Sequence, residues 1–183
     1  SISYEENVSF DGATTRNISV TYYPANGLDR EIVATSDDVY GDTNNKILSS
    51  ISTSEGNVRV TSAYPGEATI NLVIDREQGE DLTGTITANV SDVAVTRLSV
   101  PSSTFGTLSY FVTVTISPYP SNYTKNHFVG DYSIYSGESN SFAQATLSGS
   151  RLTVRRRAAQ YSGSLTVCVR SEAGYTGCGT YSK

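Results

Sequence analysis

The chain has 183 residues and a formal net charge of −5, and 37% of its residues are hydrophobic. Its content of Val, Ile and Tyr is too high for a disordered chain, and its acidic balance argues against general binding of nucleic acid, which requires a basic face. No apolar run approaches the length of a membrane span. The 13 tyrosines, together with the absence of Met and Trp, are typical of β-sheets with small cores.

The first half of the chain contains short segments in which apolar residues alternate with polar ones. This period-2 pattern indicates strands with one buried face, and clusters of Gly, Pro, Asn and Asp between the segments indicate turns. Strands are therefore expected at residues 2–10, 16–23, 31–34, 58–60, 68–74 and 85–90.

The second half of the chain continues in the same way. Strands are expected at residues 95–100, 112–116, 127–129, 132–134, 145–147, 152–154 and 165–169. No window keeps a periodicity of 3.6 residues, so the sequence predicts no substantial helix and an all-β fold.

Two stretches of the chain repeat one pattern. Residues 12–24 and residues 106–118 each begin with Gly, alternate apolar and polar residues, and end with Pro, and they lie 94 residues apart. On this alignment Ile18 corresponds to Val112. A repeat near half the length of a chain favours two modules.

The number and spacing of the expected strands indicate the type of module. About seven short strands in roughly 90 residues, with turn signals between them, are the pattern of an immunoglobulin-like sandwich. The sequence therefore predicts two tandem immunoglobulin-like β-sandwich domains, residues 1–91 and residues 92–183, with the boundary at Ser91-Asp92.

The late part of each repeat carries a strand, a turn that contains Gly, and a further strand. The first copy of this motif is residues 57–70, and the second copy has its strands at residues 150–154 and 162–167. Together with the Gly before the second strand and the Pro after it, the motif resembles the bacterial immunoglobulin-like group 2 family, which includes invasin- and intimin-like domains. The resemblance implies a spacer or adhesive stalk on a bacterial surface, or an ornament on a bacteriophage capsid or tail.

The two cysteines lie in the last expected hairpin. Cys168 and Cys178 are each five residues from Ala173 at its tip, which places them opposite each other within reach of a cross-strand disulfide. Because Leu165 and Val167 should face the core, Cys168 should point outward. A disulfide would favour an oxidising compartment, and the alternative is two unpaired surface thiols.

Two groups of oxygen-bearing side chains could suit Ca²⁺. They are Asp37, Asp38, Asp42, Asn44 and Asn45 in one loop, and Asp75, Glu77, Glu80 and Asp81 in another. The first spacing matches no EF-hand loop, and turns prefer the same residue types. Two cysteines and one distant histidine are too few ligands for a metal. We therefore expect no metal and no cofactor.

One basic cluster and two tyrosines are the candidate binding residues. Arg155, Arg156 and Arg157 could meet a phosphate, a sulfated glycan or an acidic partner, although a solvated run in a connection is the alternative. Tyr119 and Tyr123 are candidates because tyrosine combines rigid apolar area with a polar tip.

No acid, base, nucleophile or metal constellation is visible in the sequence, so we do not expect an enzyme. The first hypothesis is a non-enzymatic structural or adhesion module, extracellular on a cell surface or on a virion. Its partner would be a protein or glycan on a cell surface, or another surface or virion subunit. A carbohydrate-binding accessory module is an alternative that needs aligned exposed aromatic rings, and a bacteriophage decoration protein is another. Neither nucleic acid binding nor membrane insertion is expected.

Overall fold

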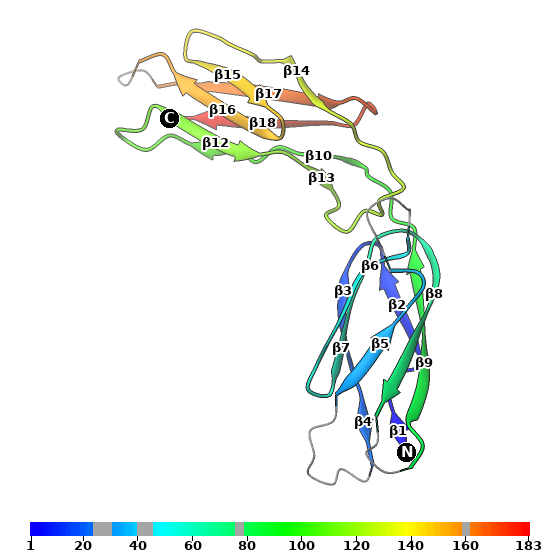
Figure 1. The fold of residues 1–183 in the computed structure, drawn as a ribbon. Helices are drawn as coiled ribbons and strands as arrows, with labels where there is room; N and C mark the ends of the chain where they lie inside the picture. The colour runs from blue at the N-terminus through cyan, green and yellow to red at the C-terminus, as the bar shows by residue number, and fades with distance from the viewer. Residues whose placement is uncertain (24–30, 40–45, 76–78, 159–161) are drawn as a thin grey trace. The chain divides into compact units, whose positions relative to one another are not determined.

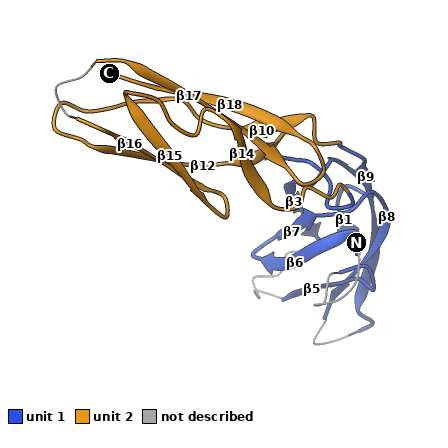
Figure 2. Ribbon diagram, turned by 90° about the horizontal axis from the view of Figure 1, so that it is seen from above, with its two compact units in different colours: residues 1–93, 122–126 blue, residues 94–121, 127–183 orange. Residues whose placement is uncertain are grey.

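A computed structural model describes residues 1–23, 31–39, 46–75, 79–158 and 162–183. All regular structure in these ranges is β-strand, so the predicted all-β fold is confirmed. The chain divides into two compact units (Figure 2). Unit 1 comprises Ser1–Val93 and Asn122–Asn126, and unit 2 comprises Ala94–Ser121 and His127–Lys183.

Unit 1 consists of a four-stranded sheet in the order β2-β9-β8-β5, a three-stranded sheet in the order β3-β7-β6, and a short pairing of β1 with β4 (Figure 1). β2 runs parallel to β9, and neighbouring strands are otherwise antiparallel. The strands are β1 (Ile2–Ser3), β2 (Asn7–Asp11), β3 (Thr15–Ser19), β4 (Thr21–Tyr22), β5 (Ile32–Thr35), β6 (Leu48–Ser54), β7 (Asn57–Ser62), β8 (Gly66–Ile74) and β9 (Leu82–Ser91).

Unit 2 has a four-stranded sheet in the order β11-β18-β17-β14, a three-stranded sheet in the order β12-β16-β15, and a pairing of β10 with β13. The strands are β10 (Arg97–Ser99), β11 (Ser103–Thr104), β12 (Phe111–Thr115), β13 (Ser117–Tyr119), β14 (Tyr132–Ser136), β15 (Ala143–Ser148), β16 (Arg151–Arg156), β17 (Ser164–Ser171) and β18 (Thr176–Ser182).

Both units share one strand order. In each, a short early strand runs parallel to the last strand of the four-stranded sheet, and the following strand joins the other sheet beside a hairpin. Two packed sheets of four and three strands are typical of an immunoglobulin-like β-sandwich. The strands alternate buried and exposed side chains, so each unit has its own apolar core between its two sheets.

A segment from the second half of the sequence, Asn122–Asn126, completes unit 1. The Asn122 side chain donates a hydrogen bond to the backbone oxygen of Asp11 at 2.7 Å. Thr124 is fully buried, and its hydroxyl donates to a carboxylate oxygen of Asp92 at 2.7 Å. Unit 1 is therefore discontinuous in the sequence.

The domain ranges expected from the sequence, 1–91 and 92–183, are continuous and do not include this crossing of the chain. Residues 122–126 read Asn-Tyr-Thr-Lys-Asn, a composition that indicates only a turn. The hydrogen bonds that join this segment to unit 1 depend on tertiary contacts that no local pattern encodes.

The alignment of the two repeats is corrected by the pairing of their strands. Ile18 pairs with Val58 in unit 1, and Val114 pairs with Leu152, the counterpart of Val58, in unit 2. Ile18 therefore corresponds to Val114 and not to Val112. A shift of two residues keeps every side chain on the same face, so the alternating pattern alone could not detect it.

Candidate functional site

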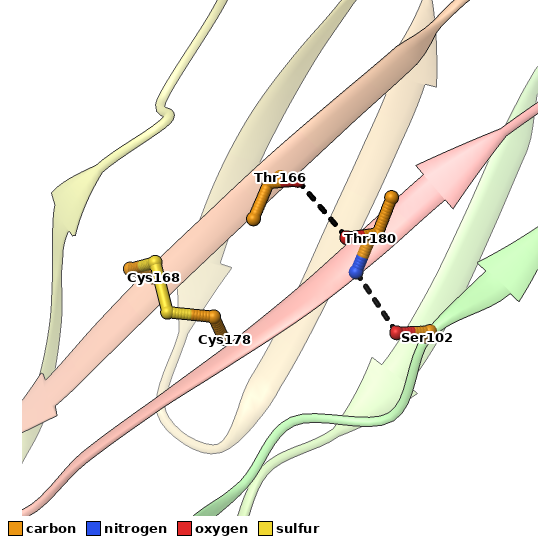
Figure 3. Close-up of a disulfide and its surroundings, with 5 residues drawn as sticks. All are labelled: Ser102, Thr166, Cys168, Cys178 and Thr180. Atoms are coloured by element: carbon orange, nitrogen blue, oxygen red, sulfur yellow. Dashed lines mark hydrogen bonds between the residues drawn. A yellow bond between two sulfur atoms is a disulfide. The ribbon is translucent and has the colours of Figure 1, made fainter.

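The disulfide lies in the hairpin formed by β17 and β18. Cys168 and Cys178 are direct partners in the register of the two strands, and a disulfide joins them (Figure 3). Val167 and Val169 on either side of Cys168 are fully buried, whereas Cys178 is exposed. The bond therefore lies on the outer face of the sheet, as the alternation predicted, and not between the two sheets.

A second cross-strand contact lies beside the disulfide on the same outer face. The hydroxyls of Thr166 and Thr180 are 2.9 Å apart, and the N–H of Thr180 donates to the hydroxyl of Ser102 at 2.9 Å (Figure 3). These bonds tie the hairpin to the chain before β11. Unit 1 has Asn71 opposite Thr85 in its matching hairpin, so the covalent link belongs to unit 2 alone.

The three consecutive arginines do not form one exposed basic patch. They continue the alternation of β16, so Arg156 faces the core with 1% of its surface exposed, whereas Arg155 and Arg157 are exposed. Arg157 donates from Nε to the carbonyl oxygen of Asn140 at 2.7 Å. Since Arg156 is buried, only Arg155 and Arg157 are exposed to meet a partner. The binding role of these two residues stays a prediction.

Arg156 has a structural position within unit 2. Its Nη2 and Nε both donate to the carbonyl oxygen of Ser109, at 2.7 and 3.1 Å. The guanidinium carbon lies 5.3 Å from the ring centroid of Phe105 and 5.8 Å from that of Tyr110. A buried cation held by hydrogen bonds and aromatic faces fixes the loop before β12 against β16.

The two candidate tyrosines belong to different units. Tyr119 is exposed at the end of β13 in unit 2, and the guanidinium carbon of Arg97 lies 4.1 Å from its ring centroid. Tyr123 is half-buried in unit 1, and the ammonium of Lys125 lies 4.2 Å from its ring centroid. Each ring therefore already has a cation on one face.

Sequence reasoning missed an exposed apolar strip that leads into β12. Leu108 is 88% exposed, and the next apolar residues, Tyr110 and Phe111, are 46% and 58% exposed. Arg155, on the neighbouring strand, lies with its guanidinium carbon 6.0 Å from the ring centroid of Phe111. The signal was present in the sequence, because Phe111 shares the outward parity of Thr113.

The residues considered for calcium are only partly described. Asp42, Asn44, Asn45 and Glu77 lie outside the described residues. Within residues 1–23, 31–39, 46–75, 79–158 and 162–183, no group of three or more His, Cys, Asp or Glu side chains is placed to hold a metal ion. The same ranges contain no helix that is long and apolar enough to cross a membrane.

No protein-family model and no curated protein matches the sequence. Solved structures do match. Sidekick-1 immunoglobulin domains 1–5 match at 11% identity and a TM-score of 0.41, over 99% of this chain and 39% of that chain. A chimeric titin Z1Z2 matches at 17% identity and a TM-score of 0.35, over 99% and 94%. The endo-fucoidan hydrolase MfFcnA4 from glycoside hydrolase family 107 matches at 11% identity and a TM-score of 0.44, over 98% of this chain and 27% of that one.

Proposed function

We propose that this chain is a tandem pair of immunoglobulin-like modules that acts as a non-enzymatic structural or adhesion element, displayed on a cell surface or on a virion. The observation that carries the proposal is the disulfide between Cys168 and Cys178 on the outer face of unit 2. Disulfides persist in oxidising environments and are rare in the cytosol, where thiols are kept reduced. An accessible bond of this kind favours a location outside the cytoplasm.

The distribution of side chains supports a binding or structural role. The strands of both units direct their apolar residues into two separate cores and their Ser and Thr residues outward. The large exposed apolar side chains of unit 2 include Leu108, Phe111 and Phe128. Rigid sandwiches with exposed aromatic residues on their loops and edges suit contact with a protein or glycan, or with other subunits of a surface layer or virion.

The location of the protein in its source is the first test. Intact virions and cell envelopes from the source would be purified separately, and the chain would be measured in each by quantitative immunodetection without reductant. We expect it in one of these two fractions with the disulfide closed, because thiol alkylation before reduction should label neither cysteine. Recovery in the soluble cytoplasmic fraction with both thiols free would contradict the proposal.

The two fractions separate the two versions of this role. A fixed number of copies per virion would assign the chain to a bacteriophage structural or decoration role, with the shell as its partner. Recovery in cell envelopes would assign it to bacterial surface adhesion, the role that the resemblance to bacterial immunoglobulin-like group 2 domains implies.

A carbohydrate-binding accessory module is the second candidate. It is favoured by exposed tyrosines on unit 2 that carry an arginine beside the ring, Tyr119 with Arg97 and Tyr135 with Arg170 at 5.4 Å. A panel of neutral and sulfated glycans would be tested for binding to the chain and to its Tyr119→Ala and Tyr135→Ala variants. Binding that either variant lowers tenfold would support this candidate, and no binding in the panel would reject it.

A further inference from the structure

β12 forms an edge of the three-stranded sheet in unit 2. β16 pairs with one side of β12, and no described strand of unit 2 pairs with its other side. Among the described strands β10 forms a ladder with β13 and none with β12, and the chain then pairs through β11 with β18 of the four-stranded sheet. The lateral side of Phe111–Thr115 is therefore open.

The backbone of β12 presents alternate hydrogen-bonding groups at this open side. Arg156 donates its N–H to the oxygen of Tyr110 at 2.8 Å, and Ile116 donates to the oxygen of Ser150 at 2.7 Å. The even-numbered residues of β12 therefore face β16, and the groups of Phe111, Thr113 and Thr115 face away from it. The oxygen of Phe111 accepts the Ser109 hydroxyl at 2.9 Å, and the groups of Thr113 and Thr115 remain available to a new strand.

The other edge strands of unit 2 carry features that discourage pairing. β11 has two residues, and β14 has an irregular register between Ile134 and Ser136. β15 is covered by the preceding segment, because Ala145 donates its N–H to the oxygen of Glu138 at 2.7 Å. Short length, bulges and covering segments are the usual protection of sheet edges. β12 has none of these.

The corresponding edge in unit 1 is protected by charge. Arg16 of β3 pairs with Val60, and in unit 2 the residue at this position of the register is Val112, which pairs with Val154. Arg16 donates to the oxygen of Ser9 at 2.9 Å and lies 3.4 Å from the carboxylate of Glu5. An arginine at an edge opposes the addition of a strand, and a valine does not.

The inward side chains of β12 are incompletely covered. Val112 and Val114 pack against the core of unit 2 but are only partly buried, whereas Ile18, the unit 1 counterpart of Val114, is 2% exposed. A strand added at the open side would remove apolar surface of Val112 and Val114 from water, and the exposed apolar strip before β12 would extend the contact.

We propose that β12 is a self-association edge, which pairs antiparallel with β12 of a second copy of this chain about a two-fold axis through Thr113. In this register Phe111 lies opposite Thr115 of the second copy, and the outward-facing backbone groups of the two strands meet. The two three-stranded sheets become one continuous sheet. This proposal rests on unit 2 alone and goes beyond the surface or virion role.

Charge favours a second copy as the occupant. Residues 106–118 contain no charged side chain, so self-pairing opposes no like charges although the whole chain has a net charge of −5. The hydroxyls of Thr113 and Thr153 are 3.3 Å apart on the outer face, and the two-fold axis would extend this row of threonines across the junction. Cross-strand pairs of threonine hydroxyls stabilise sheets.

The size and symmetry of the contact define the expected assembly. An isologous edge pairing closes on itself, and the other edges of unit 2 are protected, so the product is a dimer and not a fibre. A junction of two five-residue strands buries less than the roughly 1,200 Å² of a standard interface. We therefore expect a weak dimer, with a dissociation constant of about 1 μM or higher, at or beyond the weak end of the range for standard interfaces.

Sedimentation equilibrium of the full chain from about 5 μM to 1 mM tests the proposal. Thr113→Lys would place two like charges opposite each other at the axis. Thr113→Pro would remove the backbone N–H that points to the open side of β12. Each substitution should therefore raise the dissociation constant at least tenfold. Thr146→Lys is the matched control, because Thr146 is exposed on the outer face of the same sheet but lies on β15. It should dimerise like the unmodified chain.

Cross-linking tests the register. With a short thiol-to-thiol reagent, Thr113→Cys should give a covalent dimer in high yield and Thr146→Cys should not. Thermal melting of every variant would verify that unit 2 is folded.

Three results would overturn the proposal. They are a monomer throughout the concentration range, a dimer that Thr113→Lys leaves intact, and equal cross-linking at both positions. A chain that stays monomeric but binds an added extended peptide would instead assign the edge to a strand from another protein.

Discussion

Arg155, Arg156 and Arg157 have the same chemistry and follow one another in the chain, yet the middle one is buried and the outer two are exposed. The alternation of β16 alone decides this difference, because Leu152, Val154 and Arg156 share one face. Burial of a guanidinium is tolerated here because Ser109 accepts two of its hydrogen bonds and aromatic rings lie beside it.

Arg156→Ala should destabilise unit 2 by about 2–4 kcal/mol. The substitution removes a packed side chain and leaves the carbonyl oxygen of Ser109 without two hydrogen bonds. Chemical denaturation measured by hydrogen exchange of the core amides of unit 2 would give this value. Arg155→Ala is the control and should change the stability by about 0.5 kcal/mol or less, and an equal loss in both variants would contradict the structural role of Arg156.

Tyr181 provides a second test at a single side chain. It is fully buried, its hydroxyl donates to the oxygen of Pro101 at 2.8 Å, and burial raises its pKa to about 12. The unfolded chain loses this proton near pH 10, whereas the folded chain keeps it up to about pH 12. The full free energy of unfolding is therefore present below pH 10, and it falls as the pH rises from 10 through 12.

The free energy of unfolding should therefore fall between pH 10 and pH 12. In Tyr181→Phe the decline should be shallower, because the titrating group is absent, although the variant also loses the hydrogen bond to Pro101. Urea unfolding of both proteins at several pH values in this window gives the comparison. Parallel declines in the two proteins would show that other groups cause the loss.

The direction and the burial of many single side chains could be predicted from the sequence. The outward direction of Cys168 followed from parity, and the burial of Arg156 could have been found by the same reasoning. The exposure of Phe111 follows from the same parity, whereas that of Leu108 does not, because Leu108 precedes β12 and lies outside the alternation of the strand.

At the scale of the strands, alternation predicted the type of element and the faces but not the detailed match between the two repeats. The pairing shifts β3 against β12 by two residues, which preserves the pattern and therefore leaves no trace in it. The shift has a physical effect, because it puts Val112 at the position of Arg16.

The β17–β18 hairpin gives the prediction at this scale. The disulfide closes a loop with a sequence separation of 10, and constraining the unfolded chain by a loop of that length stabilises the folded state by about 2–3 kcal/mol. Reduction, or the double substitution of Cys168 and Cys178 by Ser, should lower the stability of unit 2 by this amount. Core amides of unit 1, followed by hydrogen exchange, serve as the internal reference and should not change.

At the scale of the whole molecule, the division into units does not follow the order of the sequence. The chain leaves unit 1 after Val93, returns for Asn122–Asn126, and leaves again. The returning segment is held by side-chain and backbone hydrogen bonds to unit 1, among them the bond from Ala13 to the oxygen of Asn122 at 2.8 Å. Unit 1 therefore depends on residues that a boundary at Ser91-Asp92 would exclude.

Gly12→Ala tests this dependence. Gly12 has a φ of +70°, and a Cβ there would collide with the carbonyl oxygen of Asn122 and the side chain of Val93. Gly56→Ala is the matched control within unit 1, since Gly56 also has a positive φ, of +67°, but a Cβ there would meet only the carbonyl oxygen of Val20 at 3.6 Å, an ordinary contact. Backbone strain alone should cost each variant about 1–2 kcal/mol.

Because of the collision, Gly12→Ala should lower the free energy of unfolding by about 2 kcal/mol or more beyond the loss in the control variant. Thermal or urea unfolding of unit 1 gives this difference. A chain truncated after Val93 should show a similar loss, because it lacks the segment that Gly12 contacts. Equal stability of the truncated chain and of unit 1 in the full chain would show that the segment is dispensable.

The discontinuity of unit 1 also limits when this unit can finish folding during translation. Roughly 30 residues separate Val93 from the segment that completes the unit, and translation adds about 5–20 residues per second. For a few seconds the emerging chain therefore holds an unfinished first sandwich while the early strands of the second one appear. The fully buried Thr124 and its bond to Asp92 can form only at the end of this interval, so the first unit to be made cannot be completed without part of the second half of the sequence.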